Sequence, residues 1–277
     1  MKYIDSEYID KIENKYNSGE VISRRKSIYY NGIPNTLSSK VYYVLSEHDK
    51  IEWSKCYNDP IYFMEKYLSL KLRKYQLKWI NLYKNNKQII YNISRQTGIN
   101  TILSALNLHT LIFEQKNILV FSIKLDVSKE YIDIIKKYYY KLPYFLKPNI
   151  LIWNNNILKF KNSKVVIYNN NVDVSEFNIY QYLDFAFNKQ NILTTHISEI
   201  ISKIDYKIIL SSTPNGCHYY YEIYKNSILP DEHPDKNNFV SIKTYWYEVE
   251  GRDDIWKEDM IKMIGLESFN KEYNLEF

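Results

Sequence analysis

Three short polar segments carry the residue types needed to bind phosphate groups and a metal ion. They cover residues 94–98, 184–187 and 211–216, and each follows an apolar run of strand type. A helix that begins after such a segment offers unpaired N–H groups to phosphate oxygens. In phosphoryl-transfer sites a lysine neutralises phosphate charge, a hydroxyl binds Mg²⁺, and an acid at a strand end completes the metal shell. These segments are therefore the candidate site.

The elements around these segments predict an α/β domain with a mainly parallel sheet flanked by helices. Apolar runs predict strands at residues 88–93, 117–123, 164–168, 179–183 and 207–210 and a hairpin at 151–160. Helical spacing predicts helices at residues 61–68, 75–83 and 101–113, and one that Asp126 or Ser128 caps and that runs to residue 142. In parallel sheets, ligands bind where strands end and helices begin.

Composition excludes several classes of protein. The net charge of +5 permits contact with nucleic acid without requiring it. The 29 tyrosines are spread along the whole chain, so the codon bias of an AT-rich genome explains them more simply than a base-stacking surface. Cys56 and Cys217 lie far apart, which predicts neither a zinc site nor a disulfide framework. The sequence shows no signal peptide, and no apolar run is long enough to span a membrane.

Four motifs carry a resemblance to a known family. They read LRKYQ at residues 72–76, NISRQTG at 92–98, LDFAF at 183–187 and STPNG at 212–216. In order and spacing they resemble the motifs of large terminases of tailed bacteriophages, of the T-even phage type. The resemblance implies a P-loop NTPase-like ATPase domain of the additional-strand type over residues 51–277, with residues 1–50 as an N-terminal extension. The family's nuclease domain is expected to be absent, because no later acidic cluster follows.

The resemblance also implies site residues. Those expected to bind nucleotide are Tyr75, Gln76, Ser94, Arg95, Gln96, Thr97, Gly98, Ile99, Asn100 and Thr101. Those expected to form the family's coupling motif are Ser212, Thr213, Pro214 and Asn215. Arg95 and Asp184 are the expected catalytic residues, and Asp184 is the candidate Mg²⁺ ligand. Each also has a plainer interpretation: Arg95 as a surface arginine, Asp184 as a strand-end cap, and residues 75–76 as an ordinary helix start.

The sequence departs from the family's pattern at the groups that carry charge. The family's loop reads S-R-Q-x-G-K-T-T, whereas here Ile99 replaces the lysine and Asn100 the Mg²⁺-binding hydroxyl. In one alignment Leu183 replaces the metal-binding aspartate and Asp184 the catalytic glutamate. Shifted by one residue, Asp184 is the aspartate and Phe185 replaces the glutamate. Either way one acid of the pair is missing, so ATP and Mg²⁺ are expected as cofactors only if the site is active.

The expected function is that of the ATPase motor domain that packages viral DNA into the procapsid, in the host cytoplasm and away from membranes. Its expected partners are double-stranded DNA, the portal, and a small terminase or separate nuclease subunit, with a homo-oligomer possible. The alternative is a catalytically impaired accessory protein or relic that binds a partner or DNA without turnover. A general DNA-binding protein is the weaker third hypothesis, since only the positive charge supports it.

Overall fold

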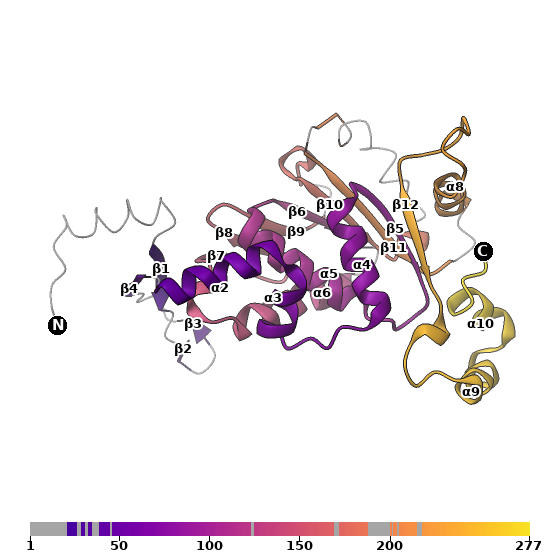
Figure 1. The fold of residues 1–277 in the computed structure, drawn as a ribbon, viewed down its shortest axis with the longest axis horizontal. Coiled ribbons are helices and arrows are strands. Elements are labelled where there is room, and N and C mark those ends of the chain that lie inside the picture. The colour runs from indigo at the N-terminus through magenta and orange to yellow at the C-terminus, as the bar shows by residue number, and fades with distance from the viewer. Residues whose placement is uncertain are drawn as a thin grey trace.

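The computed structural model begins with two small antiparallel strand pairs (Figure 1). It describes residues 21–26, 29–30, 33–34, 39–44, 46–122, 125–168, 172–187, 200, 202–203, 205–214 and 218–277. In the predicted N-terminal extension, β1 (Val21–Lys26) pairs with β4 (Ser39–Val44), and β2 (Tyr29–Tyr30) pairs with β3 (Ile33–Pro34). Neither pair belongs to the main sheet.

An eight-stranded sheet forms the body, in the order β12-β5-β11-β10-β6-β9-β8-β7. Its strands are β5 (Gln88–Ile93), β6 (Ile118–Phe121), β7 (Ile150–Trp153), β8 (Ile157–Phe160), β9 (Lys164–Ile167), β10 (Ile179–Leu183), β11 (Lys207–Ser212) and β12 (Val240–Thr244). Pairing is parallel from β12 through β9, and the hairpin β7–β8 adds two antiparallel strands. This confirms the predicted α/β fold, with β11 as the additional strand between β5 and β10.

Helices cover both faces of this sheet (Figure 1). Core residues of α2 (Glu47–Asn58), α3 (Pro60–Tyr67), α4 (Lys74–Asn85), α5 (Ile99–His109) and α6 (Leu125–Lys141) pack on one face, and those of α8 (His218–Ser227) on the other. The C-terminal helices are α9 (Asp254–Ile264) and α10 (Leu266–Glu272). Short turns are η1 (Thr110–Glu114), η2 (Tyr144–Leu146), η3 (Val174–Glu176), η4 (Phe185–Phe187) and η5 (Trp246–Glu248). Among the described residues, every helix is too short or too polar to cross a bilayer.

Three predicted boundaries were wrong. Ser211 and Ser212, expected in a turn, continue β11 because they pair with Tyr91 and Asn92 of β5. The helix expected at 101–113 begins two residues earlier, at Ile99, and ends in the π-helical turn η1. α6 begins at Leu125, before both residues that were expected to cap it. Pairing with β5 accounts for the error at Ser211 and Ser212, because it overrides their local turn preference.

A buried polar group ties α5, α6 and β10 together. The Asn107 amide donates to the Tyr131 hydroxyl (2.7 Å) and to Gln181 Oε1 (2.9 Å), and Gln181 Nε2 donates to the same hydroxyl (2.7 Å). Burial raises the pKa of Tyr131 well above its usual value, so this phenol stays protonated. The three side-chain donors of this group are all paired, whereas Asn107 Oδ1 has no partner, so the group stabilises the fold through the bonds its donors make. It therefore fixes α5, the helix that starts at the candidate site, against the strand that ends there.

Removing one hydroxyl should test this arrangement. Tyr131→Phe leaves Gln181 Nε2 without its acceptor, and we expect a loss of about 1–3 kcal/mol in unfolding free energy. Tyr140→Phe is the matched control, because it removes the same atom from the same helix at a side chain that is 52% exposed, and we expect a change within about 0.5 kcal/mol. Urea denaturation measures both. Equal losses in the two variants would contradict the role given to Tyr131.

Candidate functional site

The carboxyl ends of β5, β11 and β10 meet at one pocket of about 450 Å³. All three polar segments singled out from the sequence contribute to its wall. Its lining residues are Ile93, Ser94, Arg95, Gln96, Thr97, Gly98, Ile99, Asn100, Glu130, Asp184, Ser211, Ser212 and Thr213. Parallel pairing produces this meeting, because the ends of neighbouring parallel strands finish at the same edge of the sheet.

The loop between β5 and α5 has a backbone suited to anions. Gln96 (φ 58°) and Gly98 (φ 86°) both adopt the left-handed conformation. A Cβ at Gly98 would lie 3.1 Å from Gln76 Nε2, so glycine is required by both backbone angle and space. The Thr97 hydroxyl donates to the Ser94 carbonyl (3.0 Å) and closes the turn. Such turns direct successive N–H groups into a concave surface that binds anions.

The first turn of α5 adds further donors. No side chain caps this helix, and no acidic residue lies in its first turn. The Ile102 N–H donates to the Gly98 carbonyl (3.2 Å), so the amides that precede it within the helix are left for an external partner. Ile99 and Asn100, which carry two of these amides, line the pocket. The helix end is therefore an anion site built from backbone alone.

The Ser94 side chain is a second indication of a ligand, separate from the backbone donors. Its side chain is fully buried, and its hydroxyl has no hydrogen-bond partner. Its backbone N–H is fixed, because it donates to the Thr244 carbonyl of β12 (2.9 Å). A buried hydroxyl without a partner destabilises the fold by about 1–3 kcal/mol. An unpaired hydroxyl at the wall of a pocket is what a site for a hydrogen-bonding ligand requires.

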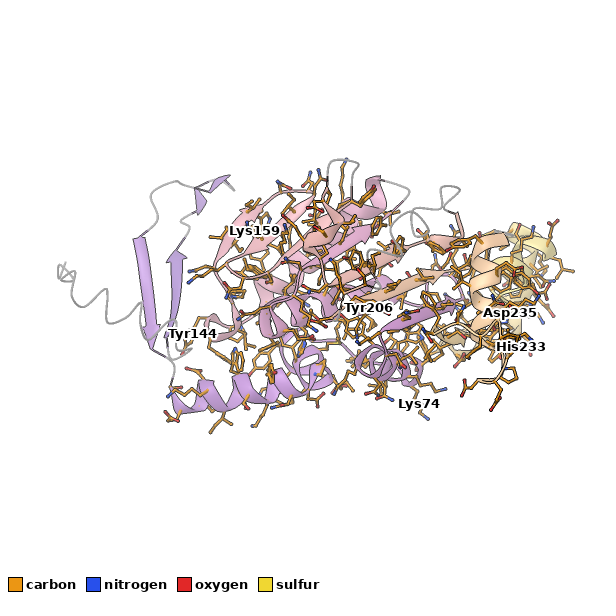
Figure 2. The ribbon with its side chains drawn as sticks, turned by 90° about the horizontal axis from the view of Figure 1, so that it is seen from above. Lys74, Tyr144, Lys159, Tyr206, His233 and Asp235 are labelled. Carbon is orange, nitrogen blue, oxygen red and sulfur yellow. The ribbon has the colours of Figure 1, made fainter. Side chains whose placement is uncertain are left out.

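Tyr75 and Gln76, the expected adenine-contacting pair, hold the loop itself. The Tyr75 hydroxyl (3.0 Å) and Gln76 Nε2 (3.2 Å) both donate to the Thr97 carbonyl. Gln76 Oε1 accepts from the Arg73 N–H (3.0 Å), so the Gln76 amide is occupied at both ends. Tyr75 also lines a second pocket, of about 720 Å³, with basic residues of the α4 start that include Lys74, which points away from the sheet (Figure 2).

Arg95 lines the pocket, but its guanidinium is paired elsewhere. Arg95 Nη1 lies 2.9 Å from Glu272 Oε1 of α10, and the Arg95 N–H donates to the Glu272 carbonyl (3.1 Å). Glu272 is not part of the pocket wall. The cation that the sequence places at the phosphates is thus held by the C-terminal helix.

Asp184 is the strand-end acid that faces the pocket. It adopts a left-handed conformation (φ 50°), and its side chain is exposed. Leu183 (2% exposed) packs into the core on the α5 face, and Phe185 (3%) into the core on the α8 face. Neither could present a carboxylate to the pocket in this conformation. In both sequence alignments Asp184 is the surviving acid, and in the structure it is the exposed residue of the three at this strand end.

Glu130 is a pocket residue that sequence reasoning missed. It belongs to α6, the helix that follows β6, and it is exposed at the pocket beside the strand-end segments. The sequence motifs predicted acids at strand ends only. A signal was present, since a helix that follows a parallel strand starts at the same edge of the sheet. The pocket therefore holds two carboxylates from different elements, Asp184 and Glu130.

The segment after β11 is tied to the segment after β10. The Ser212 hydroxyl accepts from the Ala186 N–H (3.1 Å) and donates to the Thr213 carbonyl (2.8 Å). Thr213 lines the pocket and Pro214 is buried, whereas Asn215 lies outside the described residues. Of the expected coupling residues, Ser212 and Thr213 thus have direct contact with the site.

The described residues offer few side chains that could together bind a metal ion. In the described part of the chain, no cluster of three or more His, Cys, Asp or Glu side chains could hold a metal ion. His109 is buried and bonded through Nε2 to the Cys56 carbonyl (2.8 Å), and burial lowers the pKa of its imidazole. His109 is therefore a structural residue of the core. Thr101, expected beside the phosphates, is not part of the pocket wall.

Comparison with known proteins shows the fold. No protein-family model matches the sequence. The ATPase domain of the large terminase of Thermus phage P74-26 matches with a TM-score of 0.65 and 16% identity, over 79% of this chain and 98% of that one. The large terminase of bacteriophage HK97 matches with a TM-score of 0.61 and 11% identity, over 79% of this chain and 54% of that one.

A third solved structure is the large terminase of a thermophilic bacteriophage in complex with ADP. It matches with a TM-score of 0.56 and 12% identity, over 74% of this chain and 53% of that one. The chain spans about half of this protein and of the HK97 terminase, and nearly the whole P74-26 ATPase domain. Its fold is that of the ATPase domains of phage large terminases.

Two serines at the pocket should respond in opposite ways to alanine. Ser94→Ala removes an unpaired buried hydroxyl, so we expect the unfolding free energy to stay unchanged or to rise. Ser212→Ala leaves the Ala186 N–H unpaired at a site that is 3% exposed, and we expect a loss of about 1–3 kcal/mol. Thermal or urea unfolding compares them. A large destabilisation by Ser94→Ala would mean that its hydroxyl has a structural partner within the fold.

Proposed function

We propose that this chain binds ATP in the pocket between β5, β11 and β10, as the ATPase domain of a tailed-phage DNA-packaging motor of the T-even terminase type. One combination supports this most strongly: a left-handed loop, an uncapped helix start and an unpaired buried hydroxyl surround a single pocket. All three supply hydrogen bonds to an anion. The terminase-like fold supports the same conclusion, and the thermophilic-phage terminase that shares this fold was solved with ADP.

The residues of the pocket fit a nucleotide with Mg²⁺. In this proposal the amides of residues 98–100 and the Ser94 hydroxyl hold the phosphates. Mg²⁺ usually binds one or two carboxylates together with phosphate oxygens, and Asp184 and Glu130 supply that number. When bound, the ion would neutralise charge on the phosphates. Glu130 thus provides, from a helix, the second acid that the strand end lacks.

Binding without efficient turnover is the second part of the proposal. Ile99 and Asn100 replace the family's phosphate-binding lysine and Mg²⁺-binding hydroxyl, and both line the pocket without a cationic group. Positioned charge supplies most of the rate in phosphoryl transfer. Arg95 is the cation among the lining residues, and Glu272 already pairs with it. We infer an impaired ATPase, and the competing function is a catalytically impaired accessory protein or relic that binds a partner or DNA without ATP turnover.

The partners and organisation follow from this assignment and belong to the same proposal. Residues 51–277 form the ATPase domain and residues 1–50 an extension. Double-stranded DNA, the portal and a small terminase are the partners, and a ring of copies on the portal is the assembly. The site of action is the procapsid in the host cytoplasm.

ATP binding tests the first part. A fluorescent ATP analogue with Mg²⁺ should bind saturably to the purified chain, and Ser94→Ala should weaken its affinity by roughly tenfold to a hundredfold, as expected for a lost bond to a charged group. Ser104→Ala is the control, because Ser104 is also a fully buried serine near the start of the same segment of the fold yet does not line the pocket. Absence of saturable binding, or equal affinity in the two variants, would overturn the nucleotide site.

Phosphate release tests the second part. We expect slow release from the unmodified chain and a larger gain in ATP affinity than in turnover from Ile99→Lys, since a lysine alone does not restore the metal ligand. Ile99→Lys combined with Asn100→Thr should raise turnover more than either alone, because groups that hold one ion act as a unit. Leu183→Asp is excluded as a repair, since it would bury a carboxylate in the core.

Two outcomes decide the turnover question. Glu130→Gln should remove most of the turnover that the double variant gains, because it takes away one of two carboxylates at the pocket. Brisk release by the unmodified chain, abolished by Arg95→Ala, would show instead that Arg95 has taken over the cationic role and that the domain is an active motor.

A further inference from the structure

The second pocket, at the start of α4, is lined mainly by charged side chains. Its wall consists of Lys71, Leu72, Arg73, Lys74, Tyr75, Lys78, Glu248 and Glu250. Four of these residues are positive and two are negative, so the wall carries a net charge of +2. All four cations are exposed. The pocket is therefore an electropositive surface that is open to solvent.

The outer face of α4 extends this surface away from the pocket. Lys74, Lys78, Asn81 and Asn85 recur at helical spacing and are all exposed, whereas the opposite face of the helix is buried. Figure 2 shows Lys74 directed away from the sheet. α4 contains no acidic residue. With Lys71, which precedes the helix, these four residues form the basic face of α4.

Other helices of the chain pair their lysines with acids one turn away, as solvated helix faces usually do. Such pairs are Lys55–Glu52 in α2, Lys136–Asp133 in α6, Lys262–Asp259 in α9 and Lys271–Glu267 in α10. Within the part of the chain that the structure describes, Lys74 and Lys78 have no acidic partner. Their charges are available to an anion outside the chain.

The residue types favour phosphate over a base as the group that binds here. A pocket for a base is lined mostly by apolar side chains, whereas only Leu72 and Tyr75 of this wall are uncharged. Proteins that bind single strands stack bases on exposed rings, but Tyr75, Trp79 and Tyr83 of α4 are all buried. The basic face offers charge and amides without rings, which suits the backbone of a duplex.

The length of the helix favours an extended polyanion over a single phosphate group. The 12 residues of α4 cover about 18 Å at 1.5 Å per residue. Double-stranded DNA carries one negative charge per roughly 1.7 Å of its axis, so several phosphates lie within that length. A small anion would contact the pocket alone and leave the rest of the face unused.

We propose that the basic face of α4 binds the phosphate backbone of double-stranded DNA. Lys74 and Lys78 contact phosphates, and Asn81 extends the contact along the helix. Such contacts position the duplex without reading its sequence. The inference rests on DNA as a partner in the proposed function and identifies the surface that holds it. The two pockets share no lining residue, so DNA and nucleotide can be bound together.

Removal of two charges tests the basic face. Lys74→Gln combined with Lys78→Gln should weaken binding of a fluorescent duplex of random sequence to the full chain. Each lost phosphate contact should lower the slope of log affinity against log salt by about 0.9, which is roughly eightfold in affinity at about 0.1 M salt. Lys262→Gln combined with Lys271→Gln is the matched control, because it removes two charges that are paired within α9 and α10. The control should leave the slope unchanged.

Charge and structural effects are separated by a conservative variant. Lys74→Arg combined with Lys78→Arg keeps both charges and should keep both the duplex affinity and the salt slope. Urea unfolding should find the glutamine variant as stable as the unmodified chain, because both side chains are exposed. Arg73 is left unchanged, since its Nη1 donates to the Tyr75 hydroxyl (2.9 Å) that holds the pocket loop.

Equal duplex affinity in the two double glutamine variants overturns the inference, as does the absence of salt-dependent binding by the unmodified chain. Tighter binding of a single strand than of the duplex also contradicts it, because bases would then be the recognised group. Binding of the fluorescent ATP analogue separates the remaining outcomes. Loss of ATP binding with duplex binding intact in the Lys74→Gln, Lys78→Gln variant assigns these cations to the nucleotide and overturns the DNA surface. Duplex binding that depends on these lysines in a chain without ATP binding overturns the nucleotide site alone.

Discussion

Parallel pairing of three neighbouring strands is the constraint on which this site depends. The register sets Ser211 of β11 beside Leu183 of β10, and Ser212 beside Asn92 of β5, so the strands finish nearly level. Their core positions are buried on both faces, which fixes strand direction and end point without any charged group. The segments that follow these strands therefore lie next to one another. Their polar residues line a shared pocket, because the apolar core fills both faces of the sheet.

The pocket keeps the backbone groups that could bind an anion but lacks side-chain charge at two positions of its loop. In the proposed site, backbone groups hold the anion. Residues that keep the loop in shape are present: Gly98 has a positive φ and a Cβ there would press on the Gln76 amide, and Tyr75 and Gln76 hold the Thr97 carbonyl. Side-chain charge is what is missing, at Ile99 and Asn100. Amides bind a ground-state phosphate well, whereas rate depends on charge positioned where it develops. If the proposed function is right, the retained parts favour binding and the altered ones weaken turnover.

The loop also joins two parts of the molecule that have separate cores. On one side it continues β5 into α5, within the large core, and on the other it carries the contacts of Arg252 and Glu272. A loop tied to both parts transmits a change in its own bonding to whichever is less firmly packed. The lightly buried C-terminal helices are that part.

The sequence by itself determined the alternation of strands and helices, hence the parallel sheet and the edge at which Ser94, Asp184 and Thr213 meet. Those features depend on apolar runs and turn residues, which are local. Burial of Leu183 and Phe185 in the two cores, with Asp184 exposed at the pocket, became visible only in the folded chain, because strands buried on both faces show no alternation that would orient side chains at their ends. The positions of Glu130 at the pocket and of Glu272 beside Arg95 could not be predicted from the sequence either. Both residues belong to helices that are distant in sequence from the loop. No local sequence pattern shows which distant side chains come into contact when the helices pack.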